Sequence, residues 1–246
     1  MINILLNGCN GNMGKAMIQY VNTLPNFNIL YGIDKENSNL FHSINKKPDV
    51  IIDFSTVSAT FSALNYAVEN LVPIVIATTG FSQNDIKKIN EFSEAIPIFK
   101  SSNMSYSIHL VSNIAANLAK KLKNMDIEII EKHHRNKKDA PSGTALMIGN
   151  AINKKCGKKY KFVFDRCFHT SIDNNTKKSK NEIGFSSLRG GSLVGEHSIL
   201  FLGENETIEI THTAYSRNIY IEGALDAARF IITKKNGLYD MEDLVG

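Results

Sequence analysis

The sequence of 246 residues predicts an α/β protein made of two domains. In the first hundred residues, short apolar runs alternate with segments of helical periodicity, which is typical of a parallel sheet with helices on both faces. A glycine-rich turn falls where the first apolar run gives way to the first helical segment. Beyond residue 103 the strands cluster instead of alternating with helices, which indicates a second, α+β domain.

The elements of the first domain follow in order. Each expected strand is short and largely apolar, as a strand buried on both faces requires; the runs are residues 2–7, 27–33, 50–54, 74–77 and 96–99. Between them, apolar residues recur at helical spacing, which predicts helices at 15–23, 59–69 and 84–94.

The glycine-rich turn contains Gly8, Gly11 and Gly14, a Gly-x-x-Gly-x-x-Gly spacing in place of the commoner Gly-x-Gly-x-x-Gly. Asp34 closes the second strand, 20 residues after Gly14. In this context the helix N-terminus can hold a pyrophosphate and Asp34 an adenosine ribose. A turn that only permits tight packing is the alternative. We therefore predict a Rossmann-like dinucleotide-binding domain.

Small and polar residues after later strands complete the expected cofactor site, because such sheets bind ligands at their carboxyl edge. Taken singly, each of these segments also fits an ordinary turn or cap. The predicted cofactor-binding residues are Gly8, Cys9, Asn10, Gly11, Asn12, Met13, Asp34, Lys35, Ala77, Thr78, Thr79, Ser101, Ser102, Asn103 and Met104. The carboxylate of Asp34 favours NADH, while the cation of Lys35 can bind the 2′-phosphate of NADPH. Both cofactors are expected to work, with NADH modestly favoured.

The second domain is expected to hold helices at 107–123 and 141–154 and strands at 126–131, 182–188, 196–202 and 206–213. A last helix at 220–233 carries alanines that allow close packing. We place the dinucleotide-binding domain at residues 1–104, completed by 217–246, and a substrate-binding and tetramerisation domain at 105–216.

Residues 131–145 are the most informative segment of the chain. His133, His134 and Lys137 place two imidazoles and an ammonium in one short stretch, which we expect to be an exposed loop. Asp139 is expected to cap the following helix, with Pro141 in its first turn. A solvated basic loop before an ordinary helix is the alternative.

The helix start after this loop can serve as an anion site. If the helix begins there, the amides of Ser142, Gly143 and Thr144 point outward and favour a carboxylate. A proton donor, a cation and an anion cradle in one run are typical of an active site.

Charge and composition narrow the classes of protein. The net charge is +4, but no aromatic residues alternate with the basic ones, so we expect no nucleic-acid partner. The charge suits an anionic substrate and cofactor, and the basic run within 173–181 is expected to be a surface loop. No apolar run is long enough to span a membrane and no secretion signal begins the chain. Three widely spaced cysteines suggest neither a disulfide framework nor a metal site, so a cytoplasmic protein is expected.

The run Glu131-x-His133-His134-x-x-Lys137-x-Asp139-Ala-Pro-Ser-Gly-Thr-Ala145 resembles the signature of the 4-hydroxy-tetrahydrodipicolinate reductase (dihydrodipicolinate reductase) family of lysine biosynthesis. Further segments fall in the family's order and spacing over essentially the whole chain, among them 8–14, 53–55, 78–81, 102–103, 188–191, 195–197, 209–212, 216–217 and 223–225. Asn12 and Met104 depart from the arginine and the aromatic residue usual in the family.

The resemblance implies NAD(P)H-dependent reduction of 4-hydroxy-tetrahydrodipicolinate to tetrahydrodipicolinate in the diaminopimelate pathway. It also implies a homotetramer assembled through the second domain's sheets, and a final helix that returns to the first domain.

The resemblance also implies roles for the residues of the loop. His133 donates a proton, which an imidazolium can do near neutral pH, and Lys137 donates a proton or stabilises charge. A dicarboxylate substrate is held by His134, Ser142, Gly143, Thr144 and Arg217. Glu131 orients an imidazole, although a residue at the exposed end of a strand is an equally good interpretation of it. For Arg217 the alternative interpretation is an ordinary surface arginine.

Two other classes remain possible. The chain could be another dinucleotide-dependent dehydrogenase of a small amino or hydroxy acid, which substrate screening would reveal. It could also be a non-catalytic nucleotide-binding or nucleic-acid-binding protein, for which a gel shift at physiological salt is the test. Neither explains residues 131–145.

Overall fold

A computed structural model describes residues 1–164 and 178–246, which form two compact units. The first unit comprises Met1–Tyr106 and Asn218–Gly246, and the second comprises Ser107–Arg217. Cys167 and residues 173–177 of the predicted surface loop lie outside the described residues. The chain therefore enters the second unit once and returns to complete the first.

The first unit is built on a six-stranded sheet in which all neighbouring strands are parallel. The strand order is β11-β5-β4-β3-β1-β2. The strands are β1 (Ile2–Asn7), β2 (Phe27–Ile33), β3 (Val50–Asp53), β4 (Ile74–Ile76), β5 (Pro97–Lys100) and β11 (Gly237–Tyr239). Side chains of successive strand residues point to opposite faces. Ile4 and Leu6 accordingly enter one core and Leu5 the other, and all three are fully buried.

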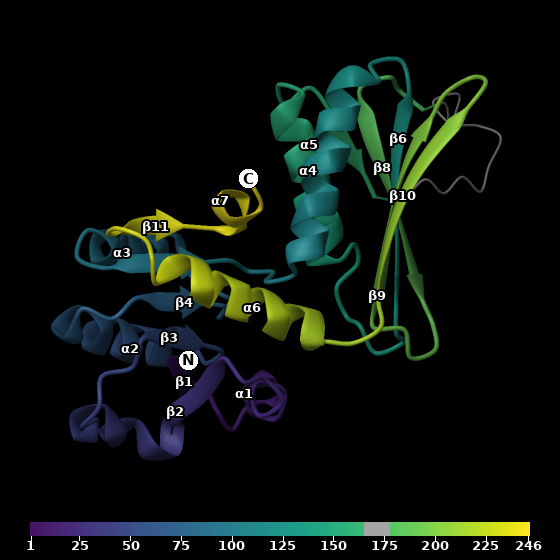
Figure 1. Ribbon diagram of the computed structural model, residues 1–246. Coiled ribbons are helices and arrows are strands. Elements are labelled where there is room, and N and C mark those ends of the chain that lie inside the picture. Colours follow the sequence, from purple (N-terminus) through teal and green to yellow (C-terminus); the bar gives the residue numbers. More distant parts are fainter. Residues whose placement is uncertain (165–177) are drawn as a thin grey trace. The chain divides into compact units, whose positions relative to one another are not determined.

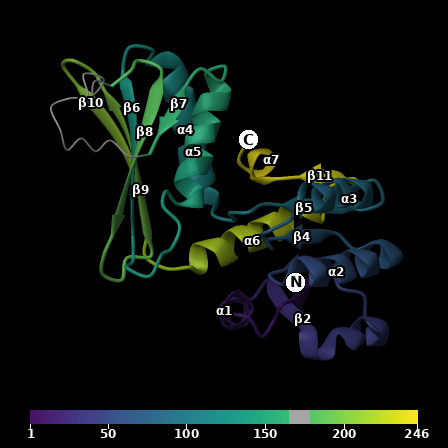
Figure 2. The ribbon, with the colours of Figure 1, turned by 180° about the vertical axis from the view of Figure 1, so that it is seen from behind.

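Helices cover both faces of this sheet, as the apolar runs predicted (Figure 1 and Figure 2). One core includes side chains from α1 (Asn12–Val21), α6 (Asn218–Ile231) and α7 (Met241–Val245). The opposite core includes side chains from α2 (Val57–Asn70), α3 (Gln83–Ser93) and the 3-10 segment η1 (Lys35–Ser43). Helix α6 approaches the backbone at Met104 so closely that only glycine fits at position 223: a Cβ there would lie 1.6 Å from the carbonyl oxygen of Met104.

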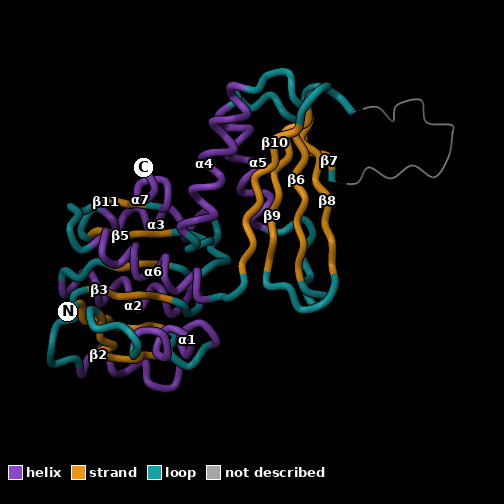
Figure 3. The backbone as a smooth tube through the Cα atoms, turned by 45° about the vertical axis from the view of Figure 1, so that its right-hand side comes forward, coloured by secondary structure: helices purple, strands orange, loops and turns teal. Residues whose placement is uncertain are grey.

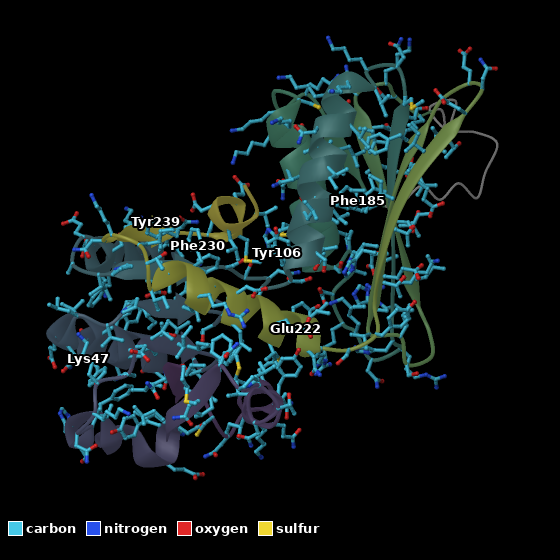
Figure 4. The ribbon with its side chains drawn as sticks, in the orientation of Figure 1. Lys47, Tyr106, Phe185, Glu222, Phe230 and Tyr239 are labelled. Atoms are coloured by element: carbon cyan, nitrogen blue, oxygen red, sulfur yellow. The ribbon has the colours of Figure 1, made fainter. Side chains whose placement is uncertain are left out.

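The second unit holds a five-stranded mixed sheet in the order β10-β9-β6-β8-β7 (Figure 3). Its strands are β6 (Asp126–His133), β7 (Lys161–Val163), β8 (Glu182–Arg189), β9 (Gly195–Leu202) and β10 (Thr207–Ala214). Strands β7 and β8 run parallel to β6, while β9 and β10 form antiparallel pairs. Helices α4 (Tyr106–Lys121) and α5 (Gly143–Lys155) pack on one face. Phe185 lies between the sheet and these helices (Figure 4).

Strand β6 alternates strictly between buried and half-buried residues. Ile127 and Ile129 enter the core under the helices, and the same alternation turns Glu131 and His133 inward at the end of the strand. The expectation of an exposed loop at His133 is therefore wrong: it is the last residue of β6 and only 8% exposed.

The start of α5 also differs from the expectation. Its N-cap is Ser142, whose Oγ accepts a hydrogen bond from the amide of Ala145. Asp139 is not the N-cap, although its carboxylate accepts a hydrogen bond from the backbone of Gly143, and Pro141 precedes the first helical residue. Ser142 is the N-cap because its own amide donates a hydrogen bond to Glu131 of the neighbouring strand β6. That tertiary contact cannot be predicted from the local sequence.

Candidate active site

A pocket of about 730 Å³ lies at the glycine turn of the first unit. Gly8 adopts φ +85°, and a Cβ on it would lie 2.6 Å from the carbonyl oxygen of Phe54. A Cβ on Gly14 would lie 2.1 Å from the carbonyl oxygen of Gly8. Only glycine therefore fits at positions 8 and 14, where the turn, the strand and the helix lie close together. Such a close approach of backbone to a helix N-terminus is suited to binding a pyrophosphate.

Asp34 holds the turn as well as facing the pocket. Its two carboxylate oxygens accept hydrogen bonds from the amides of Asn10 (2.8 Å) and Lys35 (2.7 Å). Each carboxylate oxygen can accept further bonds, so ribose hydroxyls remain possible partners. The residues at this end of the pocket fit the adenosine portion of a dinucleotide.

The pocket includes part of the predicted cofactor set and adds residues that sequence reasoning missed. Of the predicted residues, Gly8, Asn10, Gly11, Asp34 and Lys35 line it. Its other lining residues are Asn7, Phe54, Ser55, Thr56, Ser58, Ala59 and Ser62. Most of these surround the start of α2, and the available signal was the capping residue Thr56, which follows the apolar strand β3 after two residues.

Several other predicted cofactor residues have partners within the protein. Cys9 and Met104 are buried in the hydrophobic core, and Met13 and Ala77 pack against it. The Thr78 hydroxyl accepts a hydrogen bond from the amide of Ser55. Ser101 Oγ donates to the carbonyl oxygen of Asn103 and accepts from its amide. The remaining members, Asn12, Thr79 and Ser102, are exposed.

A buried carboxylate fixes the floor of the pocket. Asp53 is fully buried at the end of β3, and burial raises its pKa although hydrogen bonds from its neighbours act in the opposite direction. Asn7 Nδ2 donates to it over 2.8 Å, Thr60 Oγ1 over 2.6 Å, and the Ser55 hydroxyl also donates to it. Asn7 and Ser55 line the pocket, so this network sets its shape.

In the second unit, His133 Nδ1 lies 2.6 Å from Glu131 Oε2. Burial lowers the pKa of His133, and the hydrogen bond with Glu131, which raises it, does not offset burial. The protonated ring that can donate a proton is therefore less populated near neutral pH than it would be for an ordinary histidine. The predominant form at neutral pH is a neutral ring that donates its Nδ1–H to the carboxylate, which leaves Nε2 as the exchangeable position.

Glu131 is 1% exposed, so its alternative interpretation as a surface strand end is wrong. Its carboxylate accepts two hydrogen bonds from the Arg189 guanidinium, at 2.6 and 2.7 Å, and one from the Ser142 amide at 3.1 Å. Burial would raise the pKa of Glu131, but the hydrogen bonds, led by those of Arg189, outweigh it and bring the pKa to about 2. Glu131 is therefore a permanent anion beside His133.

His197 is a further buried imidazole that sequence reasoning did not assign to the site. Its Nε2 lies 2.9 Å from Ser142 Oγ, and its ring centroid lies 5.2 Å from that of His133. Burial lowers the pKa of His197 to about 4, so the ring is neutral. Its inward position in the alternating strand β9 was the available signal.

The loop between β6 and α5 supplies the cation. Lys137 Nζ lies 2.9 Å from Asp139 Oδ1, and the pKa of Asp139 is lowered chiefly by Lys137. The Ser142 amide is taken by Glu131, so the expectation that it faces outward is wrong. Gly143 is exposed and Thr144 half-exposed at the first turn of α5.

The two remaining predicted substrate-binding residues, His134 and Arg217, differ in how exposed they are. His134 is half-buried, with its amide donating to the carbonyl oxygen of Leu193 over 2.8 Å. Arg217 is exposed at the last position of the second unit. Within residues 1–164 and 178–246, no group of three potential metal ligands gathers. No helix in that part of the chain is long and apolar enough to cross a membrane.

The first unit has a pocket at its glycine turn, and the second has a buried Glu–His pair beside a helix start. These two features are typical of a dinucleotide-dependent oxidoreductase. Comparison with known proteins agrees. Family models described as dihydrodipicolinate reductase, N-terminus and C-terminus, match residues 2–104 and 107–245. The chain belongs to the dihydrodipicolinate reductase family.

Similar proteins support this membership over the full length. The 4-hydroxy-tetrahydrodipicolinate reductase of Caldanaerobacter subterraneus subsp. tengcongensis is 44% identical, with 100% of this chain and 98% of the relative covered. That of Clostridium novyi is 42% identical with the same coverage. Among solved structures, dipicolinate-bound dihydrodipicolinate reductase from Paenisporosarcina sp. TG-14 shares the fold, with a TM-score of 0.78 at 24% identity over 98% of this chain and 97% of the other.

Proposed function

We propose that the chain catalyses the NAD(P)H-dependent reduction of 4-hydroxy-tetrahydrodipicolinate to tetrahydrodipicolinate in the diaminopimelate pathway to lysine. Membership of the family makes it an NAD(P)H-dependent oxidoreductase. The observation that carries the proposal is the buried Glu131–His133 pair, which lies beside the start of α5 in a chain with a glycine-turn pocket. The test is oxidation of NADH and NADPH in the presence of enzymatically generated 4-hydroxy-tetrahydrodipicolinate. Absence of turnover with that substrate, but turnover with another amino or hydroxy acid, would overturn the proposal.

The bound cofactor supplies a hydride, and Gly8, Gly11 and Asp34 are the residues we propose to hold it. His133 in its protonated form is the proposed proton donor through Nε2, because its Nδ1–H is held by Glu131 in both protonation states. Lys137 is proposed to stabilise negative charge or to donate a proton.

The lowered pKa of His133 gives the proposed acid a definite pH dependence. A group that donates a proton must be protonated, so its contribution is present below its pKa and declines as pH rises through that pKa. Because burial lowers the pKa of His133 below the ordinary 6.5, this decline should begin below the pH expected for an exposed histidine.

The substrate carboxylates are proposed to bind at two places. His134, Gly143 and Thr144 would take one at the helix start, and Arg217 the other. The solved relative from Paenisporosarcina is dipicolinate-bound, which supports a flat dicarboxylate as the ligand class.

Pyridine-2,6-dicarboxylate is therefore expected to inhibit competitively with the substrate. Thr144→Val and Arg217→Ala should each raise its inhibition constant about tenfold, in line with the loss of one hydrogen bond to a charged group. Inhibition kinetics of the three proteins measure this, with exposed Arg135→Ala as the matched control. Equal inhibition of all of them would show that the carboxylates bind elsewhere.

Cofactor choice should depend on Asp34 and Lys35. The Asp34 charge repels a 2′-phosphate and Lys35 attracts it, so both cofactors should work with NADH modestly favoured. Lys35→Ala should shift the ratio of specificity constants further towards NADH. Asp34→Ala should shift it towards NADPH and also weaken both cofactors, because the amide of Asn10 loses its acceptor.

Steady-state kinetics with each cofactor at matched ionic strength provide the measurement. An NADPH specificity constant more than tenfold above that of NADH in the unmodified protein would contradict the preference. A ratio that neither variant changes would show that the ribose is recognised elsewhere.

The proposed assembly is a homotetramer in the cytoplasm, formed through the sheet of the second unit. Among the described residues of that unit, helices cover one face of the sheet and not the other, and Leu188 is 48% exposed although it lies in a strand. An apolar residue in this position suits an interface between copies. Light scattering coupled to size exclusion would decide the number of copies.

A further inference from the structure

Arg189 ends strand β8 beside His133, its register partner in the parallel β6–β8 pair. Its guanidinium reaches the carboxylate of Glu131 with both terminal nitrogens: Nη1 donates to Oε2 over 2.7 Å and Nη2 to Oε1 over 2.6 Å. Such a bidentate pair fixes the orientation of the carboxylate as well as its charge.

The other two terminal N–H groups of Arg189 are also used. Nη1 donates to the carbonyl oxygen of Leu188 and Nη2 to that of Asp139, each over 2.7 Å. Nε is buried and has no partner in the described parts of the chain. Four of the five N–H groups of Arg189 therefore donate to acceptors within the protein. An arginine that binds an anionic ligand would instead keep terminal N–H groups for that ligand.

The carboxylate that Arg189 holds is the one that sets the state of His133. Glu131 accepts the Nδ1–H of His133, which assigns the proton of the neutral ring to Nδ1 and leaves Nε2 for exchange. Gly195 permits this ring position, because a Cβ there would lie 2.9 Å from Nε2.

We propose that Arg189 is a positioning residue for the reaction. It holds Glu131 in the orientation that fixes the tautomer and the ring orientation of His133. It also holds the loop between β6 and α5 through the carbonyl oxygen of Asp139. Lysine cannot replace it, because an ammonium is a point charge and cannot make the two parallel bonds while also reaching both carbonyls. The proposal rests on the assignment of His133 as the proton donor.

The charges around His133 give the proposal a second measurable consequence. Glu131 faces the ring from its own strand, Arg189 from β8, neutral His197 from β9, and Lys137 from the loop. Removal of the Arg189 cation leaves the Glu131 charge less compensated, so the pKa of His133 should rise. Retention of a cation at position 189 should limit that rise.

The test compares Arg189→Lys and Arg189→Met with Arg229→Lys, a control at an exposed arginine that pairs with Asp226. Both Arg189 variants should lower kcat roughly 10- to 100-fold, as expected for a misplaced catalytic group. Their Kd for NADH, measured by fluorescence titration, should stay within twofold of the unmodified protein. The control should retain kcat.

Nitrogen-15 NMR of His133 separates positioning from a merely structural role and needs no substrate. The unmodified ring should show a single neutral tautomer with Nδ1 protonated; Arg189→Lys should show a mixture, and Arg189→Met should titrate at higher pH. If Arg189→Met does not fold, Arg189→Lys alone decides. A kcat within twofold of the unmodified protein with an unchanged tautomer in Arg189→Lys would overturn the proposal. Failure of the proposed function would instead appear as absence of reductase turnover in the unmodified protein.

Discussion

His133→Gln is expected to lower kcat about 100- to 10,000-fold, because it removes the proposed proton donor from the site. Glutamine is the better choice than alanine: His133 is only 8% exposed, and glutamine fills most of the space. KM should change far less than kcat, since the proposed carboxylate contacts lie on other residues. Lys137→Ala should lower kcat within the same range.

Steady-state kinetics and thermal unfolding of each variant provide the measurements. Lys138→Ala is the matched control, because Lys138 is the exposed neighbour of Lys137 in the same loop. We expect it to retain kcat within about twofold. Near-normal turnover in folded His133→Gln would remove His133 as the acid.

Glu131→Gln is expected to cost about 3 kcal/mol of the free energy of unfolding, because it leaves Arg189 without its carboxylate partner. The value lies at the low end for a broken buried pair, since 20% of the Arg189 side chain is exposed. Turnover should also fall, because His133 loses the acceptor for its Nδ1–H.

The pH dependence of this loss has a definite sign. The pKa of Glu131 is lowered from 4.5 to about 2, so its stabilising contribution is fully present above about pH 4.5 and is lost as pH falls towards 2. The difference between Glu131→Gln and the unmodified protein should therefore shrink across that window. Denaturant unfolding at several pH values measures it, and Asp226→Asn, which breaks an exposed pair, should cost less than about 1 kcal/mol throughout.

The sequence predicted the elements whose patterns are local. The apolar runs of β1 and β2 were placed at the residues that the structure gives them, because strands buried on both faces stand out from their polar surroundings. Strands β7 and β11 were missed because each has only three residues and, unlike the wholly apolar β4, includes a lysine or a glycine. The 3-10 segment η1 was missed because most of its nine residues are polar, and helix α7 because it has only five residues.

The candidate site divides in the same way. His133 and Lys137 were found because they lie together in one run of the chain. Arg189 and His197 were not, because their contacts with Glu131 and Ser142 depend on how β6 pairs with β8 and β9. The lowered pKa of His133 could not be predicted either, since it follows from burial that only the folded chain creates.

The return of the chain to the first unit affects the order of events during synthesis. The second unit is one continuous segment, Ser107–Arg217, so all of its residues are synthesised before Asn218–Gly246, which complete the first unit. The first unit cannot finish its sheet until Gly237–Tyr239 emerge, because β11 pairs with the otherwise unprotected edge of β5. Before these residues are synthesised, the edge of β5 is unpaired, and an unpaired strand edge can pair with a strand of another chain. Residues 237–239 thus complete the parallel sheet and cover the edge of β5.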